Sequence, residues 1–102
     1  MTQELFTKIT DWQKVIFPKS TPLSKLAHLK DELNEVEHDI KQGNQDLKFE
    51  LADCFFLIFG IADQVGITHE QLTTAIAEKL QINQQRKWQQ PNKDGVVFHV
   101  KD

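Results

Sequence analysis

The sequence lacks the features that mark several large protein classes. It has one cysteine, Cys54, which lies within an apolar run and is therefore expected to be a small core residue in a reducing compartment. It also has no basic excess, because its formal net charge is −3. This balance argues against a general nucleic-acid-binding protein, which usually carries a surplus of lysine and arginine.

No segment is typical of a signal peptide or a membrane span. The N-terminus, MTQELFTKITDW, lacks the basic and then apolar layout of a secretory signal. The longest uncharged apolar stretch, Cys54 to Ala62, has nine residues, far fewer than the roughly 20 needed to cross a bilayer. No repeat, low-complexity segment or linker divides the chain. We therefore expect one domain over residues 1–102, in the cytoplasm and without a membrane partner.

Apolar residues recur every three or four positions, which predicts four helices joined by short loops. The expected ranges are about Gln3–Ile16, Pro22 to a stop at Gly43, about Gln45–Gln64, and Thr68 to about Lys87. The tail that follows contains a turn and a β-prone piece, Val96–Val100. The predicted fold class is all-α, a four-helix bundle with a short extended C-terminal tail.

Two acids within the most apolar segment raise the first functional question. The stretch DLKFELADCFFLIFG contains Glu50 and Asp53, three residues apart on a helix with little polar surface. A buried carboxylate must be paired, bound to metal or neutralised, because its isolated burial costs several kcal/mol. The alternative is that both acids lie on a narrow solvated strip.

The expected partners are Glu32 and Glu35, which are also three residues apart, on the preceding helix. Two helices joined by a short connection pack antiparallel, which can bring the two acidic pairs level. Each pair of carboxylates about 4 Å apart would repel by about 4 kcal/mol at an effective dielectric constant of 20. A divalent cation removes this repulsion, and an all-oxygen ligand set suits Mg²⁺ or Mn²⁺. A solvated face remains the alternative for Glu32 and Glu35.

The fourth predicted helix changes character along its length. Its apolar stripe, Leu72 and Ile76, continues at helical spacing as Lys79, Asn83 and Arg86. Cationic and amide groups opposite a metal-loaded acidic cluster indicate a bound polyphosphate. The alternative is a basic helix C-terminus that complements the helix dipole.

A di-iron centre is not supported. Glu35 and His38 form one Glu-x-x-His motif, whereas a di-iron bundle needs two such motifs and two further glutamates. The remaining histidines, His28, His69 and His99, show no spacing typical of metal ligands.

These motifs together resemble the MazG-like all-α nucleoside triphosphate pyrophosphohydrolases. The order KDELNEVE, then ELAD, then KLQINQQRKW matches that family's Glu-x-x-Glu and Glu-x-x-Asp signature and its downstream basic segment. The similarity extends from DWQKVIFP to NQQRKWQQPNKDGVVFH and is greatest with the single-domain dATP/dGTP diphosphohydrolase branch.

The resemblance implies a role for each matching residue. Glu32, Glu35, Glu50 and Asp53 would hold Mg²⁺ as the catalytic cluster, and Asp31 is a further candidate ligand. Lys79, Asn83 and Arg86 would contact the phosphates. Members of the family cleave between the α- and β-phosphates without a covalent protein intermediate, which fits a chain without a plausible serine or cysteine nucleophile.

The base-binding residues are less well determined by the sequence. Trp12 and Gln13 are candidates, by stacking and by amide hydrogen bonds, although Trp12 also lies on the apolar stripe of the first helix and could belong to the core. The resemblance further implies a homodimer or homotetramer. Our leading hypothesis is a Mg²⁺-dependent pyrophosphohydrolase that acts on purine deoxynucleoside triphosphates. The rival is a non-catalytic helical module for oligomerisation or partner binding.

Overall fold

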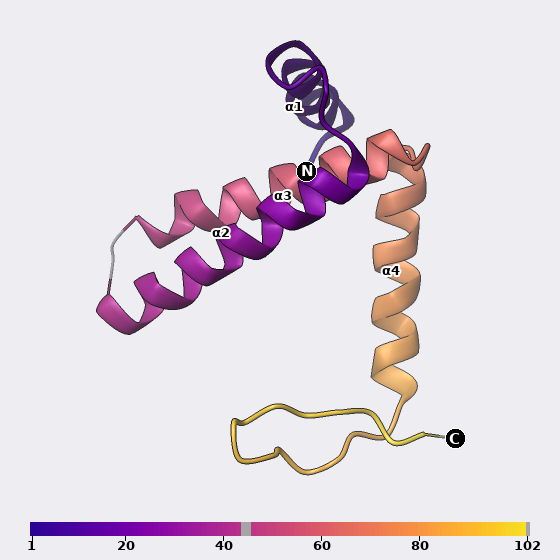
Figure 1. Cartoon of the computed structure of the whole chain (residues 1–102). Helices are drawn as coiled ribbons and strands as arrows, with labels where there is room; N and C mark the ends of the chain where they lie inside the picture. Colours follow the sequence, from indigo (N-terminus) through magenta and orange to yellow (C-terminus); the bar gives the residue numbers. More distant parts are fainter. Residues whose placement is uncertain (44–45, 102) are drawn as a thin grey trace. The chain divides into compact units, whose positions relative to one another are not determined.

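The computed structural model describes residues 1–43 and 46–101, and its elements are four helices (Figure 1). They are α1 (Gln3–Ile16), α2 (Pro22–Gln42), α3 (Leu47–Gln64) and α4 (His69–Gln85). The chain forms two compact units, Met1–Glu70 and Gln71–Asp102, and each is described by itself. The predicted all-α class is confirmed.

The predicted helix ends agree closely with the observed ones. The range of α1 is as predicted, and α2 begins with a capping box in which Ser24 N donates to Thr21 Oγ1 (3.0 Å) and Thr21 N donates to Ser24 Oγ (2.8 Å). Gly43 ends α2 in the left-handed conformation, at φ 71°. The predicted start of the third helix, Gln45, lies outside the described residues, and α4 ends two residues before Lys87.

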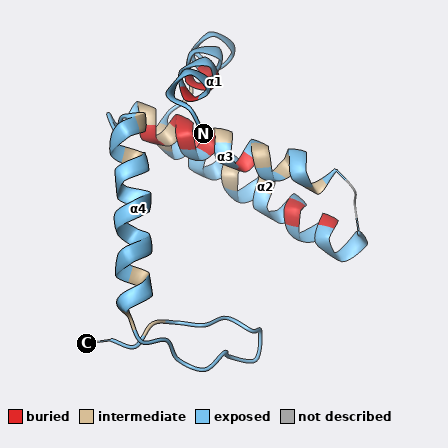
Figure 2. Cartoon of the chain, turned by 180° about the vertical axis from the view of Figure 1, so that it is seen from behind, coloured by how far each residue is buried: buried red, intermediate tan, exposed pale blue. Residues whose placement is uncertain are grey.

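In the first unit, α2 and α3 lie side by side and antiparallel, and α1 packs against α3 (Figure 1). The ring of Phe6 on α1 packs against Phe59 on α3, with centroids 5.6 Å apart. Cys54 is buried, as expected. The buried apolar side chains come from all three helices (Figure 2): Phe6, Ile9, Val36, Cys54, Leu57, Phe59 and Ala62.

Most of the apolar stripe of α2 faces away from this core, although Val36 of the same stripe is buried in it. Leu33 and Ile40 are 50% and 62% exposed, whereas Lys25 and Asp39 on the same helix are buried. The α3 helix is likewise not buried on all sides, since Phe55 is 54% exposed. A single chain therefore leaves part of this apolar surface uncovered, because three helices cannot cover every apolar side chain of α2 and α3.

The second unit ends in a turn, as predicted. The side-chain Oδ1 of Asn92 accepts hydrogen bonds from the backbone N–H groups of Asp94 and Val96, both at 2.9 Å, and Gly95 takes φ 79°. The β-prone piece returns along the preceding chain and forms one isolated antiparallel bridge between Trp88 and His99.

Within the described ranges, no single helix has the length and hydropathy to cross a membrane. The α3 and α4 helices meet that test only when they are taken together, by length and composition alone.

Side chains of α1 and α2 both reach the backbone of α3 at Gly60. A Cβ atom at this position would lie 2.5 Å from Gln13 Oε1 of α1 and 2.6 Å from Lys25 Cε of α2. Both neighbouring side chains are themselves buried, so they have little room to move. A residue without a side chain is therefore required where Gln13 and Lys25 meet α3.

We predict that Gly60→Ala destabilises the protein by about 1–3 kcal/mol, the usual cost of overpacking. Helix propensity alone would give the opposite result, because alanine is favoured over glycine inside a helix by about 1 kcal/mol. Urea unfolding measures the change. In a Lys25→Ala background, where two of the three crowding atoms are absent, the same substitution should cost clearly less. A Gly60→Ala protein that unfolds at a higher urea concentration than wild type would contradict this packing.

Candidate active site

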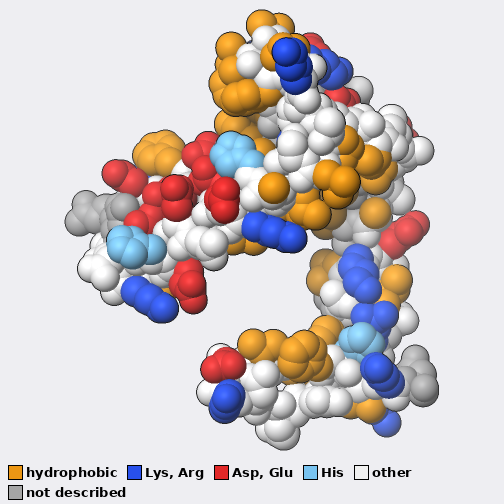
Figure 3. Space-filling view, in the orientation of Figure 1, with side chains coloured by type: hydrophobic (Ala, Val, Ile, Leu, Met, Phe, Trp, Pro, Cys, Tyr) orange, Lys and Arg blue, Asp and Glu red, His pale blue; other side chains and the backbone are white. Residues whose placement is uncertain are grey.

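Charged and polar side chains run along the interface between α2 and α3. On α2 they recur at intervals of three and four residues, so they share one helical face. Acidic side chains gather over this part of the molecule in the space-filling view (Figure 3). We call the following set the polar seam: Lys25, His28, Glu32, Glu35 and Asp39 of α2, with Glu50 and Asp53 of α3.

Glu32 and Asp53 line one cavity of the seam, of about 200 Å³. Glu32 Oε1 lies 3.3 Å from His28 Nε2, one helical turn away. Burial raises the pKa of Glu32, and the charges of Glu35 and Asp53 raise it further, while His28 acts in the opposite direction. The electrostatic environment of Glu32 thus already includes the two other acids of the predicted cluster.

Glu35 and Glu50 line a second cavity of the seam, of about 390 Å³, together with Asn34, His38 and Asp39. The Oε2 atom of Glu50 is buried and has no hydrogen-bond partner among residues 1–43 and 46–101, and the same holds for Oδ2 of Asp39. A buried carboxylate oxygen without a donor is costly. This second cavity therefore offers two carboxylate oxygens that a bound cation could satisfy.

The four acids fit a divalent metal in their chemistry. They provide only oxygen ligands, as Mg²⁺ and Mn²⁺ prefer, and they come from facing positions on two packed helices. Within residues 1–43 and 46–101, no three His, Cys, Asp or Glu side chains are already placed to hold a metal ion. Asp31 is exposed and lines neither cavity.

The cavity that holds Glu32 and Asp53 is also lined by the base-binding candidates of α1, Trp12 and Gln13. Trp12 is 51% exposed and meets the ring of Phe17 edge-on at 5.7 Å, so the alternative that it belongs to the core is wrong for this chain. Gln13 is buried, and its Nε2 donates to the carbonyl oxygen of Phe56 (2.7 Å). The acidic and the aromatic candidates thus share one cavity.

The phosphate-binding candidates belong to the second unit. Asn83 Oδ1 accepts a hydrogen bond from Arg86 Nη1 (3.3 Å), so these two residues form a pair. Arg86 lines a basic cavity of about 550 Å³ with Lys87 and Lys101, and Lys79 is exposed outside its lining. Contact of Lys79, Asn83 and Arg86 with phosphate remains a prediction.

Sequence reasoning missed three members of the polar seam: Lys25, His28 and Asp39. They repeat the spacing of Glu32 and Glu35, so the signal was a polar stripe at helical period next to the apolar one. The sequence placed Glu32 beside the apolar stripe of Leu26 and Leu33, and in the structure both leucines are exposed while the neighbouring polar stripe packs inward.

Comparison with known proteins identifies the family and the fold of the chain. A sequence model of the dATP/dGTP pyrophosphohydrolase family matches residues 5–102. A dATP/dGTP diphosphohydrolase of Salmonella phage PMBT28 is 34% identical over 96 residues, and the Eaa protein of Salmonella phage P22 is 38% identical over 53. These matches cover 92% and 52% of this chain, but only 30% and 17% of the two phage proteins.

A solved structure with a similar fold is the MazG-like pyrophosphohydrolase of cyanophage S-2L, bound to dGDP and three catalytic Mn²⁺ ions per active site. The two structures agree with a TM-score of 0.77 and 28% sequence identity, over 99% of each chain. The fold is therefore MazG-like. Together with the match over residues 5–102, this similarity shows that the chain belongs to the dATP/dGTP pyrophosphohydrolase family.

Proposed function

We propose that the protein hydrolyses purine deoxynucleoside triphosphates to the monophosphate and pyrophosphate, with Mg²⁺ as the cofactor and Mn²⁺ as a substitute. One observation carries this proposal. The cavity that Glu32 and Asp53 line also contains Trp12 and Gln13, so metal-binding oxygens and a surface for a base lie within one site. A nucleotide has these two ends, an anionic polyphosphate and a flat heteroaromatic base.

The acids of the polar seam would hold the cation. Glu32 and Asp53 would bind it from one cavity and Glu35 and Glu50 from the adjacent one, with Asp31 as a further candidate. When bound, such a cation neutralises phosphate charge and polarises the phosphorus centre. The three Mn²⁺ ions of the cyanophage enzyme favour more than one ion here as well.

The reaction needs no nucleophilic side chain. The phosphoanhydride bond between the α- and β-phosphates breaks, water supplies the new oxygen on one phosphorus, and its proton leaves with the products. The residues of this chain position the substrate, which is the main requirement of phosphoryl chemistry. Trp12 and Gln13 would hold the base. Lys79 and Arg86 would neutralise phosphate charge, and the amide of Asn83 would donate a hydrogen bond to a phosphate oxygen.

The exposed apolar side chains support a homodimer or homotetramer. Leu33 and Ile40 on α2, and Phe55 on α3, are each at least half exposed in the single chain. Exposed apolar surface of this kind commonly marks an interface, and a second copy would bury it. The free, buried thiol of Cys54 and a nucleotide substrate fit a cytoplasmic enzyme.

A product assay tests the proposed reaction directly. With Mg²⁺ present, dGTP and dATP should each yield the nucleoside monophosphate and pyrophosphate in equal amounts, as measured by ion-exchange chromatography. Pyrimidine deoxynucleoside triphosphates should react more slowly. Release of inorganic phosphate and a nucleoside diphosphate would show that the bond between the β- and γ-phosphates is cleaved instead. No turnover of any nucleotide with Mg²⁺ or Mn²⁺ would favour the rival hypothesis, a non-catalytic oligomerisation module.

Substitution of the seam acids tests the proposed site. Glu50→Gln and Asp53→Asn should each lower kcat at least a hundredfold at saturating Mg²⁺, because each removes a charged ligand and keeps the side-chain shape. The circular dichroism spectrum should not change. Glu37→Gln is the matched control, since Glu37 is 67% exposed, pairs only with Lys41 and lies outside the seam. Near wild-type turnover in either variant would contradict the assignment of Glu50 and Asp53 to the active site.

A further inference from the structure

One end of the polar seam combines an uncompensated carboxylate with an open cavity. Asp39 is only 8% exposed, and its Oδ2 has no hydrogen-bond partner in the described part of the chain. It lines the cavity of about 390 Å³ that Glu35 and Glu50 also line. Asn34, Glu35 and His38 in the same lining are exposed, so a hydrated ion can enter from solvent. Asp39 belongs to neither acidic pair of the predicted cluster, so that signature gives it no role.

The cationic groups of α2 beside Asp39 do not neutralise it. Lys41 Nζ lies 3.6 Å from Glu37 Oε1, and both of these side chains are largely exposed. His38 Nδ1 lies 3.5 Å from Asp39 Oδ1, which is beyond the usual length of a hydrogen bond, and the His38 side chain is 73% exposed. The charge of Asp39 is therefore left to a group from outside these residues.

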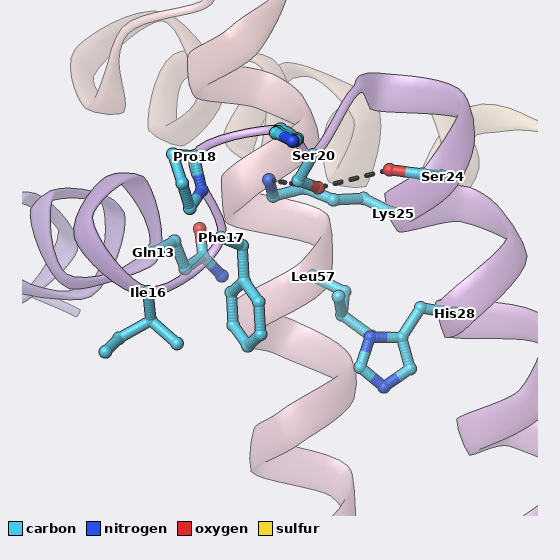
Figure 4. Close-up of a pocket in the computed structure, with 10 residues that line it drawn as sticks. Gln13, Ile16, Phe17, Pro18, Ser20, Ser24, Lys25, His28 and Leu57 are labelled. Carbon is cyan, nitrogen blue, oxygen red and sulfur yellow. Dashed lines mark hydrogen bonds between the residues drawn. The ribbon is translucent and has the colours of Figure 1, made fainter.

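A buried lysine of α2 lies at the other end of the polar seam. Lys25 is 5% exposed, and its Nζ donates to Ser20 Oγ (2.9 Å), which lies 3.2 Å from Ser24 Oγ (Figure 4). Lys25 precedes Asp39 by 14 residues, which is about 21 Å along the helix axis. This distance is too great for an ion pair. The seam thus has a buried positive charge at one end and an uncompensated buried carboxylate at the other.

The lining of the cavity around Asp39 favours a divalent cation. Among the described residues that line it, three are carboxylates, two are Asn34 and His38, and none is lysine or arginine. Mg²⁺ and Mn²⁺ prefer oxygen ligands, and Mg²⁺ commonly binds one or two carboxylates while it keeps several waters. Such an ion needs no preformed set of three protein ligands. Rotation about the Cβ–Cγ bond can turn either oxygen of Asp39 toward the cavity, since that torsion is broad for aspartate.

We propose that Asp39 and Glu50 bind a divalent cation in this cavity, so that Asp39 is a ligand beyond the four predicted acids. The ion would satisfy the two buried oxygens that lack a donor, Asp39 Oδ2 and Glu50 Oε2. Because Glu32 and Asp53 line a different cavity, this is a second ion position, with Glu35 on its lining as well. The inference rests on the proposed metal-dependent function and extends its ligand set along α2.

Manganese binding to the nucleotide-free protein tests the role of Asp39. Electron paramagnetic resonance follows free Mn²⁺ during a titration and so gives the number and affinity of the bound ions. Asp39→Asn keeps the side-chain shape and removes the charge. One bound ion should therefore bind at least about tenfold more weakly, the loss that even an outer-shell substitution commonly causes. Glu37→Gln, an exposed position of the same helix outside the seam, should bind Mn²⁺ as wild type does.

The results separate this proposal from the proposed function. If wild type binds Mn²⁺ and Asp39→Asn binds the same number of ions equally tightly, Asp39 is not a ligand and the function stands. If Asp39→Asn changes only the oligomeric state in size-exclusion chromatography, a cationic group of a second copy is its partner, and the proposal is overturned. If wild type binds no Mn²⁺ and hydrolyses no nucleotide with it, the function fails too.

A measurement on wild type decides the matter should Asp39→Asn not fold. Carbon-13 NMR resolves the side-chain carboxyl resonances of the aspartates during a titration with MgCl₂. The Cγ resonance of Asp39 should shift well beyond that of Asp11, a carboxylate of α1 whose side chain is 67% exposed. Equal shifts of the two resonances, or none, would overturn the proposal.

Discussion

The constraint on which the structure depends is the burial of charge between α2 and α3. The face of α2 that packs against α3 carries Lys25, Glu32 and Asp39, while much of its apolar face points outward. Burial and neighbouring acids already raise the pKa of Glu32, and Glu50 keeps a buried oxygen without a donor. A helix pair with such groups in its interface has a lower free energy of unfolding than the same pair with well-packed leucines there. A bound cation would offset that loss, so the site and the fold cannot be considered separately.

The same constraint accounts for the exposed apolar surface. Because the inward face of α2 is polar, Leu33 and Ile40 lie on the outside, and Phe55 of α3 is exposed as well. In a small domain these side chains need another surface to cover them. The orientation of α2 would thus explain two features together: the polar groups inside one chain and the proposed association of two chains. Gly60 shows how closely that orientation is specified, since no side chain fits between Gln13 and Lys25.

The sequence predicted the helices well and their orientation less well. Helix ends depend on local chemistry, such as the Thr21–Ser24 capping box and the left-handed Gly43, which a single sequence displays directly. The facing of α2 depends on which of two neighbouring stripes packs inward, and hydrophobicity alone selects the wrong one. The acids Glu32, Glu35, Glu50 and Asp53 could be proposed from the sequence because Glu50 and Asp53 lie in an apolar segment and need a partner. Their role as metal ligands remains a prediction. Lys25 and His28 could not be proposed in this way, because their importance comes from cavities that only the packed helices create.

If the facing acids of α2 and α3 hold a divalent cation, the metal-free folded chain keeps like charges close together. Thermal unfolding of the wild type and of Glu50→Gln/Asp53→Asn, with MgCl₂ and with NaCl at equal ionic strength, tests this proposal most directly. At a hundredfold excess over Kd the cation stabilises the folded state by about 2.7 kcal/mol, a shift on the order of 10 °C for a domain of this size. We expect this shift for wild type, little shift for the double variant, and a higher melting temperature for the double variant than for wild type without metal. A magnesium shift no larger than that in NaCl, or an equal shift in both proteins, would contradict it.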